Sequence, residues 1–187
     1  CEPGTYQPNK NSTNCTPTSP GNYSTSGSDS QRPCYPGTYA PFSEMGECSD
    51  AGYGFYVPQQ GSSLRVQCPL GQSTTIEQSR TVEDCIEAEA GNFVDPAGGP
   101  ETKCSIGSYQ PIKGQTSCLD ADVGFFVSSE GMTSQMPCVS GTYQPERGQT
   151  TCLDAEIGYY VESAGATVQL PCPSGFVTNS TRSTSIL

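Results

Sequence analysis

Cysteine carries the clearest chemistry in this sequence. The chain has 187 residues and 11 cysteines, and neighbouring cysteines mostly alternate between spacings of about 14 and about 20 residues. Cysteines at this density in a small, loop-rich chain form a disulfide scaffold, which requires an oxidising compartment. The sequence therefore predicts an extracellular or cell-surface protein stabilised by disulfides.

Other kinds of chemistry lack their usual residues. The chain contains no histidine, the commonest general base and a common zinc ligand, and no glycine-rich phosphate loop precedes a helix pattern. Two equivalent carboxylate pairs, Asp120 with Asp122 and Asp154 with Glu156, suggest Ca²⁺ as a ligand. Because calcium needs six or more oxygen ligands, we favour solvated acids and predict no metal, no cofactor and no enzyme activity.

The charge balance narrows the choice of partners. The formal net charge is −11, with 8 basic and 19 acidic side chains. Nucleic acids and anionic lipid surfaces both attract cationic proteins, so we expect neither as a partner, and no apolar stretch is long enough to insert into a membrane. An acidic surface fits a soluble protein or one with a basic partner.

Asparagine provides candidate modification sites. Four N-x-S/T sequons, an excess over chance for so few asparagines, predict N-glycans at Asn11, Asn14, Asn22 and Asn179. The segment 18–33 holds seven serines and threonines, which fits either O-glycans or ordinary loop composition. Covalent glycans are thus the only non-protein groups expected.

A short internal repeat must position these groups. Eleven glycines mark the repeat, and each lies three residues after a cysteine or after the residue that replaces the cysteine: Gly4, Gly21, Gly37, Gly54, Gly71, Gly91, Gly107, Gly124, Gly141, Gly158 and Gly175. The chain divides into turns 1 to 11, namely 1–17, 18–33, 34–50, 51–67, 68–87, 88–103, 104–120, 121–137, 138–154, 155–171 and 172–187. Such short repeats cannot fold singly and stack into rods, spacers or binding surfaces. We group them as 1–67 (Ser/Thr-rich, glycosylated), 68–103 (irregular) and 104–187 (regular).

Odd and even turns differ at the cysteine positions. In the best-preserved half, Cys104 aligns with Ala121 and Cys118 with Gln135, so an even turn has alanine and a long polar residue where an odd turn has two cysteines. The polar residues at the second position are Gln31, Arg65, Glu101, Gln135 and Gln169.

Two disulfide pairings fit the spacings. Long-loop pairing would begin with Cys15–Cys34, whereas short-loop pairing gives Cys1–Cys15, Cys34–Cys48, Cys68–Cys85, Cys104–Cys118 and Cys138–Cys152. Paired loss of both positions from even turns favours the short loops, each worth about 3 kcal/mol. Cys172 then stays unpaired, because its partner position falls near Ile186. It marks either the end of an excerpt or an intermolecular disulfide.

An aromatic residue follows the glycine by two positions in nine turns: Tyr6, Tyr23, Tyr39, Tyr56, Phe93, Tyr109, Phe126, Tyr143 and Tyr160. We predict that these rings stack from turn to turn, since the chain has little else to bury; a carbohydrate or peptide platform is the alternative. Ser73 and Val177 break the rule, so turns 5 and 11 are predicted to be irregular.

The composition favours an elongated architecture. Hydrophobic residues make up only 33% of the chain, with 16 prolines and 21 glycines, too little for one globular core of this length. Segments such as G-T-Y-Q-P read as short strands that Pro and Gly soon end. We predict a small disulfide-rich, mostly irregular fold with short β-hairpins and no helix longer than one turn. The solenoid-like stack of about eleven 17-residue turns would be a rod of roughly 110 Å.

The pattern C-x2-G-x-Y-x8-C, followed by another glycine and aromatic, matches Cys104 to Cys118 and Cys138 to Cys152 best. It resembles the ephrin-receptor-like cysteine-rich repeat and the first small module of tumour necrosis factor receptor repeats. In the latter module the two cysteines bond to each other, in agreement with short-loop pairing. The even turns depart from the pattern because they lack cysteines. The resemblance implies a non-catalytic, extracellular protein and transfers no ligand-binding residue.

These observations predict a non-enzymatic extracellular structural glycoprotein. The repeat and its uncapped ends suggest a segment of a longer protein that forms a surface filament, flagellar hair or stalk, with copies of itself as partners, because repeated head-to-tail contacts produce open fibres. The alternative is a receptor or adhesion ectodomain with a protein ligand, bound near turns 5 or 11. A lectin-like module is a third possibility, suggested only by the aromatic residues.

Overall fold

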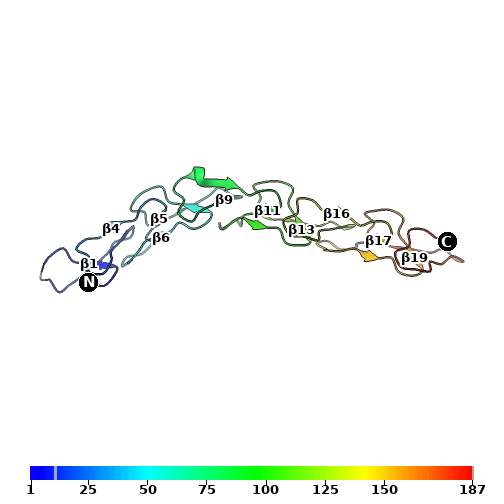
Figure 1. The fold of residues 1–187 in the computed structure, drawn as a ribbon, viewed down its shortest axis with the longest axis horizontal. Helices are drawn as coiled ribbons and strands as arrows, with labels where there is room; N and C mark the ends of the chain where they lie inside the picture. The colour runs from blue at the N-terminus through cyan, green and yellow to red at the C-terminus, as the bar shows by residue number, and fades with distance from the viewer. Residues whose placement is uncertain (11, 187) are drawn as a thin grey trace. The chain divides into compact units, whose positions relative to one another are not determined.

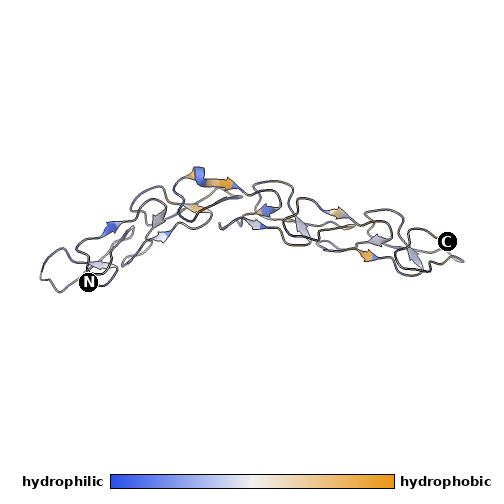
Figure 2. Ribbon diagram, in the orientation of Figure 1, coloured by the Kyte–Doolittle hydropathy of each residue, from blue (hydrophilic) through white to orange (hydrophobic). Residues whose placement is uncertain are grey.

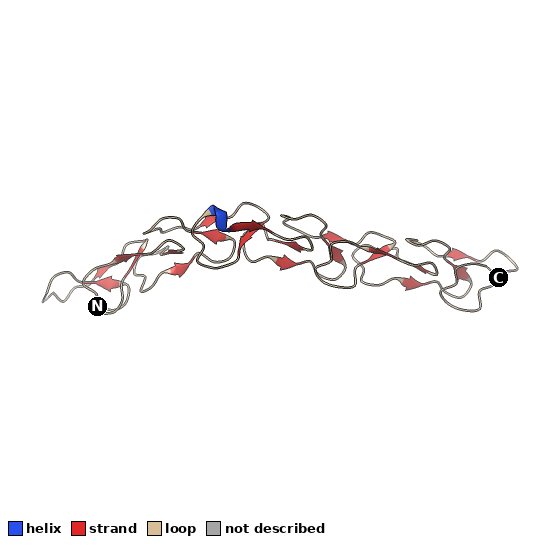
Figure 3. Cartoon of the chain, turned by 45° about the horizontal axis from the view of Figure 1, so that its top comes forward, coloured by secondary structure: helices blue, strands red, loops and turns tan. Residues whose placement is uncertain are grey.

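The computed structural model describes residues 1–10 and 12–186, which form two compact units. The first unit contains residues 1–87 and 94–101, and the second contains 88–93 and 102–187. Residues 68–103, set apart in the sequence by their irregular spacing, thus contribute to both units. The described residues make ten separate two-stranded antiparallel hairpins (Figures 1 and 3).

The hairpin strands are two or three residues long. In the first unit they are β1 (Thr5–Tyr6), β2 (Thr16–Pro17), β3 (Asn22–Tyr23), β4 (Arg32–Pro33), β5 (Thr38–Tyr39), β6 (Ser49–Asp50), β7 (Phe55–Tyr56), β8 (Val66–Gln67), β9 (Gln72–Thr74) and β10 (Cys85–Glu87). In the second they are β11 (Asn92–Phe93), β12 (Thr102–Lys103), β13 (Ser108–Tyr109), β14 (Leu119–Asp120), β15 (Phe125–Phe126), β16 (Met136–Pro137), β17 (Thr142–Tyr143), β18 (Leu153–Asp154), β19 (Tyr159–Tyr160) and β20 (Leu170–Pro171). Each odd-numbered strand pairs with the next strand in the chain.

Each hairpin follows the same plan. Turn 7 is typical: Gly107 has φ +84° and immediately precedes the first strand, and Tyr109 then pairs with Leu119 on the second. The chain closes the hairpin when Ala121 N, at the start of turn 8, donates to Gly107 O at 2.8 Å. Strands this short contribute little by themselves, so the hairpins depend on cross-links and on their neighbours.

Two positions in most turns form the core. The first is the cysteine or alanine three residues before the glycine, buried as in Cys104 and Ala121. The second lies three residues after the glycine and is buried as Val57, Val127 and Val161, or as Ala40, Ser24, Gln110 and Gln144. The core of each unit is therefore a narrow column of mostly small side chains, in keeping with the low apolar content. Figure 2 shows correspondingly few strongly hydrophobic segments.

The predicted aromatic series lies beside this column. All nine rings are half-buried and occupy the last residue of a first strand. The sequence patterns above do not single out the residue that follows each ring as a buried position. The recurrence of valine, alanine or serine at that position is the pattern that indicates its burial.

Turn 5 contains the helical turn η1 (Val82–Asp84), which is three residues long. Thr81 caps it, and the Asp84 side chain accepts from the backbone of both Arg80 (2.7 Å) and Thr81 (2.9 Å). A Cys68–Cys85 spacing of 17 residues accommodates this insertion. The predicted fold class, a small disulfide-rich chain of short hairpins in units of about 17 residues, is confirmed.

Candidate functional site

The contacts between neighbouring turns are the most regular feature of the molecule. Gly107 N in turn 7 donates to Val127 O in turn 8 at 2.8 Å, and Val127 N donates to Gln149 O in turn 9 at 3.0 Å. The same two bonds recur in both units, for example Gly37 N to Val57 O (2.8 Å) and Val57 N to Ser79 O (3.0 Å). In these turns the buried residue after the aromatic ring thus joins three successive turns through its backbone.

The glycines also contact turns two positions further along. A Cβ atom at Gly124 in turn 8 would lie 2.2 Å from Gly165 O in turn 10, and one at Gly107 would lie 2.2 Å from Gly148 O. In the first unit, a Cβ atom at Gly21 would likewise clash with Gly61 O. Glycine is therefore required at this position for two reasons. Its φ is positive, and the backbone of the second turn along approaches so closely that a Cβ has no room.

A second φ-positive position completes the contact in most of the turns. Gly131 N donates to Cys104 O at 2.9 Å, and Gly148 N donates to Ala121 O at 2.8 Å. Glu44 and Arg182 occupy this position in turns 3 and 11 with φ of +63° and +60°, a conformation uncommon for residues with a Cβ. The stack thus imposes the same backbone even where the sequence lacks glycine.

The disulfides lie within single turns. The structure joins the short-loop pairs Cys1–Cys15, Cys34–Cys48, Cys68–Cys85, Cys104–Cys118 and Cys138–Cys152. Cys172 is half-buried and has no disulfide partner among the described residues.

Hydrogen bonds from side chains take the place of the disulfide in even turns. Gln135 Oε1 accepts from Asp122 N at 2.6 Å, and Gln169 Oε1 accepts from Glu156 N at 2.8 Å. Gln31 makes the same contact with Ser19 N at 2.9 Å, while in turn 4 Arg65 Nη1 donates to Ala51 O at 2.8 Å. The polar residue that aligns with the second cysteine therefore clamps the same two chain segments without a covalent bond.

The paired carboxylates take part in contacts between turns. Asp122 lies 3.3 Å from Arg147 Nη2 and accepts from Gln135 Nε2 at 3.0 Å, and Asp154 lies 3.5 Å from Arg182 Nε. Within the described part of the chain, no group of three or more His, Cys, Asp or Glu side chains could hold a metal ion. A search of those same residues finds no helix capable of crossing a membrane.

The predicted glycosylation sites differ in their surroundings. Asn14 and Asn179 are exposed, whereas Asn22 is half-buried and its Nδ2 donates to Ser19 Oγ at 3.2 Å. Ser24, the serine of the Asn22 sequon, is only 1% exposed. In the folded turn its hydroxyl is therefore inaccessible, although glycosylation of Asn22 requires it. Asn11 lies outside the described residues.

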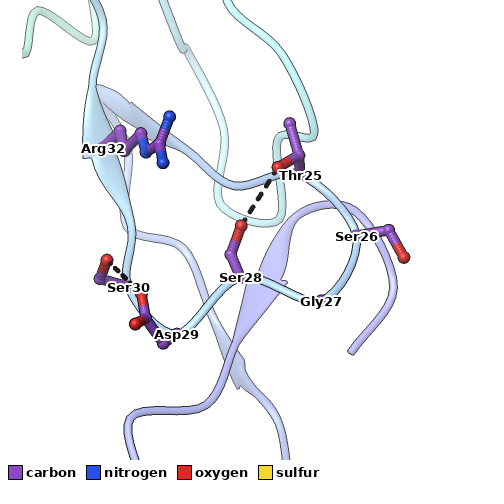
Figure 4. Close-up of a pocket in the computed structure, with 7 residues that line it drawn as sticks. All are labelled: Thr25, Ser26, Gly27, Ser28, Asp29, Ser30 and Arg32. Atoms are coloured by element: carbon purple, nitrogen blue, oxygen red, sulfur yellow. Dashed lines mark hydrogen bonds between the residues drawn. The ribbon is translucent and has the colours of Figure 1, made fainter.

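Hollows on the surface lie either within one loop or between neighbouring turns, as in the one lined by Pro3, Thr25 and Glu44. Figure 4 shows one in turn 2, lined by hydroxyl-bearing residues together with Asp29 and Arg32. Thr25 Oγ1 and Ser28 Oγ are 3.2 Å apart there, and Ser30 Oγ donates to Asp29 Oδ1 at 2.9 Å. This loop is the serine- and threonine-rich segment considered for O-glycans.

These features define a disulfide-rich repeat domain whose hairpins are bonded through their backbones. The family described as tyrosine-protein kinase ephrin type A/B receptor-like matches residues 37–85, and the same hairpin plan recurs on both sides of this segment. The match at residues 37–85, together with the disulfide-rich repeat pattern, supports an ephrin-receptor-like cysteine-rich repeat protein. Comparison with curated proteins finds no match. This family consists of non-catalytic, cysteine-rich extracellular domains. The match therefore indicates an extracellular domain of receptor type or structural type.

Proposed function

We propose that this chain is a non-enzymatic extracellular structural glycoprotein, a segment of a repeat protein that forms a surface filament, flagellar hair or stalk. The observation that carries the proposal is the stacking interface, which is made of backbone groups and is nearly identical from turn to turn. Such an interface accepts another turn irrespective of most of its side chains. Repeated head-to-tail contacts of this kind build open fibres.

The last turns present the same interface. Among the described residues, no atom lies within 4 Å of a Cβ placed at Gly158 or Gly175, whereas the equivalent Gly124 and Gly141 face carbonyl oxygens at 2.2 and 2.3 Å. Both open glycines retain φ near +85° to +89°. A further turn, from the same chain or from another copy, fits this surface as turn 10 fits on turn 8.

The test is electron microscopy of the isolated, disulfide-bonded chain. We expect end-to-end filaments, which become shorter or disappear in Gly158→Ala, because the new Cβ occupies the place of an incoming carbonyl. Gly165→Ala is the matched control, since it has a similar φ of +74° and open space at its Cβ but does not belong to that series of glycines. Isolated particles at all concentrations, or equal effects of both variants, would contradict the proposal.

A receptor or adhesion ectodomain is the second candidate, and one observation favours it. Leu119, Leu153 and Leu170 are 48%, 47% and 44% exposed, and each pairs across its hairpin with a tyrosine of the aromatic series. A regular series of exposed leucines beside aromatic rings suits a protein ligand, since large apolar side chains dominate the centre of protein interfaces. Single particles decorated by a partner, without filaments, are the outcome expected in that case.

Glycans belong to the same proposal. N-glycans are expected on the exposed Asn14 and Asn179, where they would leave the stacking interface clear. Modification of Asn22 must precede folding, because Ser24 of its sequon is buried in the folded turn. Mapping of glycopeptides from protein secreted by a eukaryotic host tests occupancy at each site.

A further inference from the structure

Turn 2 differs from the other even turns in its core. In turns 4, 6, 8 and 10 the first core position is alanine and the second is valine: Ala51 and Val57, Ala88 and Val94, Ala121 and Val127, Ala155 and Val161. Turn 2 has Thr18 and Ser24 at these positions, and each is only 1% exposed. Two hydroxyl groups are therefore buried in turn 2 where the other even turns bury hydrocarbon.

The folded turn makes no hydrogen bond to either hydroxyl. Among the described residues, Thr18 Oγ1 and Ser24 Oγ have no hydrogen-bond partner. The loop that follows is different (Figure 4), since Thr25 Oγ1 and Ser28 Oγ are 3.2 Å apart. A buried hydroxyl that gains no partner from the protein lowers the stability of the fold. Valine, the residue of the other even turns, would therefore suit position 24 better than serine does.

The Ser24 hydroxyl has a use that does not need the folded turn. Asn22, Tyr23 and Ser24 form an N-x-S sequon, in which glycan transfer to the asparagine requires the hydroxyl two residues on. The sequon at Asn179 keeps both groups on the surface, because Asn179 and Thr181 are exposed. In the sequon at Asn22 the asparagine is half-buried and the serine is buried. Folding therefore closes one sequon and leaves the other open.

Ser24 is enclosed by turns that flank it on both sides. Gly4 N in turn 1 donates to Ser24 O at 2.8 Å, and Ser24 N donates to Met45 O in turn 3 at 3.1 Å. Met45 lies 21 residues further along the chain, so it is synthesised about 1 to 4 s after Ser24 at roughly 5–20 residues per second. The disulfide Cys34–Cys48 closes turn 3 and forms later still. The sequon is therefore open for an interval during synthesis.

The folded turn also engages the Asn22 amide. Its Nδ2 donates to Ser19 Oγ at 3.2 Å and to Pro20 O at 3.4 Å. Glycan transfer forms a bond from Nδ2 to C1 of a sugar and breaks the bond from C1 to a lipid-linked diphosphate. The diphosphate leaves with the electron pair, and one Nδ2 proton passes to a base of the enzyme. The glycosylated amide keeps a single N–H, which serves Ser19 or Pro20 but not both.

We propose that Asn22 receives an N-glycan only before turns 1 and 3 pack against turn 2, and that Ser24 provides the sequon hydroxyl for this step. Glycan transfer and packing of the turn compete for the same residues, so the occupancy of Asn22 measures which is faster. Asn179 is available before and after folding. The inference rests on the glycoprotein part of the proposed function.

The direct test is glycan transfer to the purified chain. The chain is made without glycans in an oxidising bacterial compartment and is used either disulfide-bonded or fully reduced. Each form is incubated with a eukaryotic oligosaccharyltransferase and a lipid-linked oligosaccharide, and glycopeptide mapping measures occupancy. We expect Asn179 to be modified in both forms, and Asn22 at least tenfold more in the reduced chain. Equal modification of Asn22 in the two forms, or in neither, would overturn the proposal.

A pair of substitutions of nearly equal shape tests the role of Ser24. Ser24→Thr preserves the sequon and Ser24→Val removes it, and the buried Val57 shows that the equivalent position accepts a branched side chain. In protein secreted by a eukaryotic host, Ser24→Thr should keep the glycan at Asn22 and Ser24→Val should lose it. In the unglycosylated chains, Ser24→Val should have the higher midpoint of urea unfolding, because threonine retains the unpartnered hydroxyl.

Thr18→Ala is the matched control, since it introduces the residue of the other even turns at the first core position and leaves the sequon intact. This variant should keep the glycan at Asn22. A lower urea midpoint for Ser24→Val than for Ser24→Thr would assign the hydroxyl to the fold and contradict the proposal. In the secreted native chain, an empty Asn22 beside an occupied Asn179 contradicts this inference alone, whereas two empty sites contradict the glycoprotein and the inference together.

Discussion

At the scale of the residue, glycine is the most constrained position in this protein. The first glycine of a turn has positive φ and lies beneath a carbonyl from two turns along. The second glycine also has positive φ, but at Gly165 the space around the α-carbon is open. Substitutions at the two kinds of glycine therefore distinguish the cost of the left-handed conformation from the cost of a steric clash.

Gly124→Ala should therefore destabilise the chain more than Gly165→Ala. Gly165→Ala, the control, loses about 1 kcal/mol of stability because alanine disfavours the left-handed conformation. Gly124→Ala also forces its Cβ against Gly165 O, so its total loss is about 3 kcal/mol. Urea unfolding of the two proteins measures the difference. Equal midpoints would show that the turns separate easily and that the contact contributes little.

At the scale of the element, the hairpin is closed in two chemically different ways. Turns 1, 3, 5, 7 and 9 use a disulfide, whereas turns 2, 8 and 10 use a glutamine that accepts a backbone hydrogen bond between the same two chain segments. A disulfide across a loop of this length stabilises by about 3 kcal/mol, and a hydrogen bond by about 1 kcal/mol. The covalent bond is thus the larger contribution but is not required for the hairpin geometry.

Cys104→Ala combined with Cys118→Gln should convert turn 7 into a turn of the even type. We expect the fold to persist with a loss of about 2 kcal/mol, less than the loss of about 3 kcal/mol for Cys104→Ala with Cys118→Ala. Circular dichroism and urea unfolding measure both. If the glutamine variant is no more stable than the alanine variant, the clamp does not transfer between turns.

The helical turn η1 should respond to acid. Backbone N–H groups of Thr81 and Arg80 lower the pKa of Asp84 below its ordinary value of 3.8. A carboxyl whose pKa is lower in the folded state stabilises above its unfolded pKa, and this contribution is lost as the pH falls through the folded value. Asp84→Asn should therefore speed amide hydrogen exchange over residues 80–85 at neutral pH, and the difference from the native chain should vanish in strong acid.

Glu83→Gln is the control for this experiment, because it removes a charge from the same helical turn without removing the cap. Exchange in this variant should stay close to that of the native chain at every pH. A difference between Asp84→Asn and the native chain that is independent of pH would exclude the carboxylate charge as the cause.

At the scale of the whole molecule, net charge opposes the proposed self-association. Copies with a formal charge of −11 repel one another, and salt screens this repulsion over about 8 Å at physiological ionic strength. Association through the backbone stacking interface should therefore increase with salt, as measured by sedimentation velocity at fixed protein concentration. Association that weakens with salt would indicate attraction between opposite charges instead, as expected for a basic partner.

The sequence alone determined the repeat, the hairpin class and the disulfide scaffold, because these follow from local spacing. Glycine positions define the turns, and the loss of cysteines in pairs indicates which positions lie together. The resemblance to ephrin-receptor-like repeats was likewise readable from Cys104 to Cys118 and is matched at residues 37–85.

Only the tertiary structure decided how successive turns meet. Contact between a glycine and a carbonyl two turns later involves backbone atoms, which leave no signature in side-chain type beyond the glycine itself. The buried residue after each aromatic ring varies from valine to glutamine, because its backbone does the bonding. Likewise, only the hydrogen bonds show that the hydroxyls of Thr74 and Thr178 take the place of a carbonyl oxygen as acceptors for Gly54 N and Gly158 N.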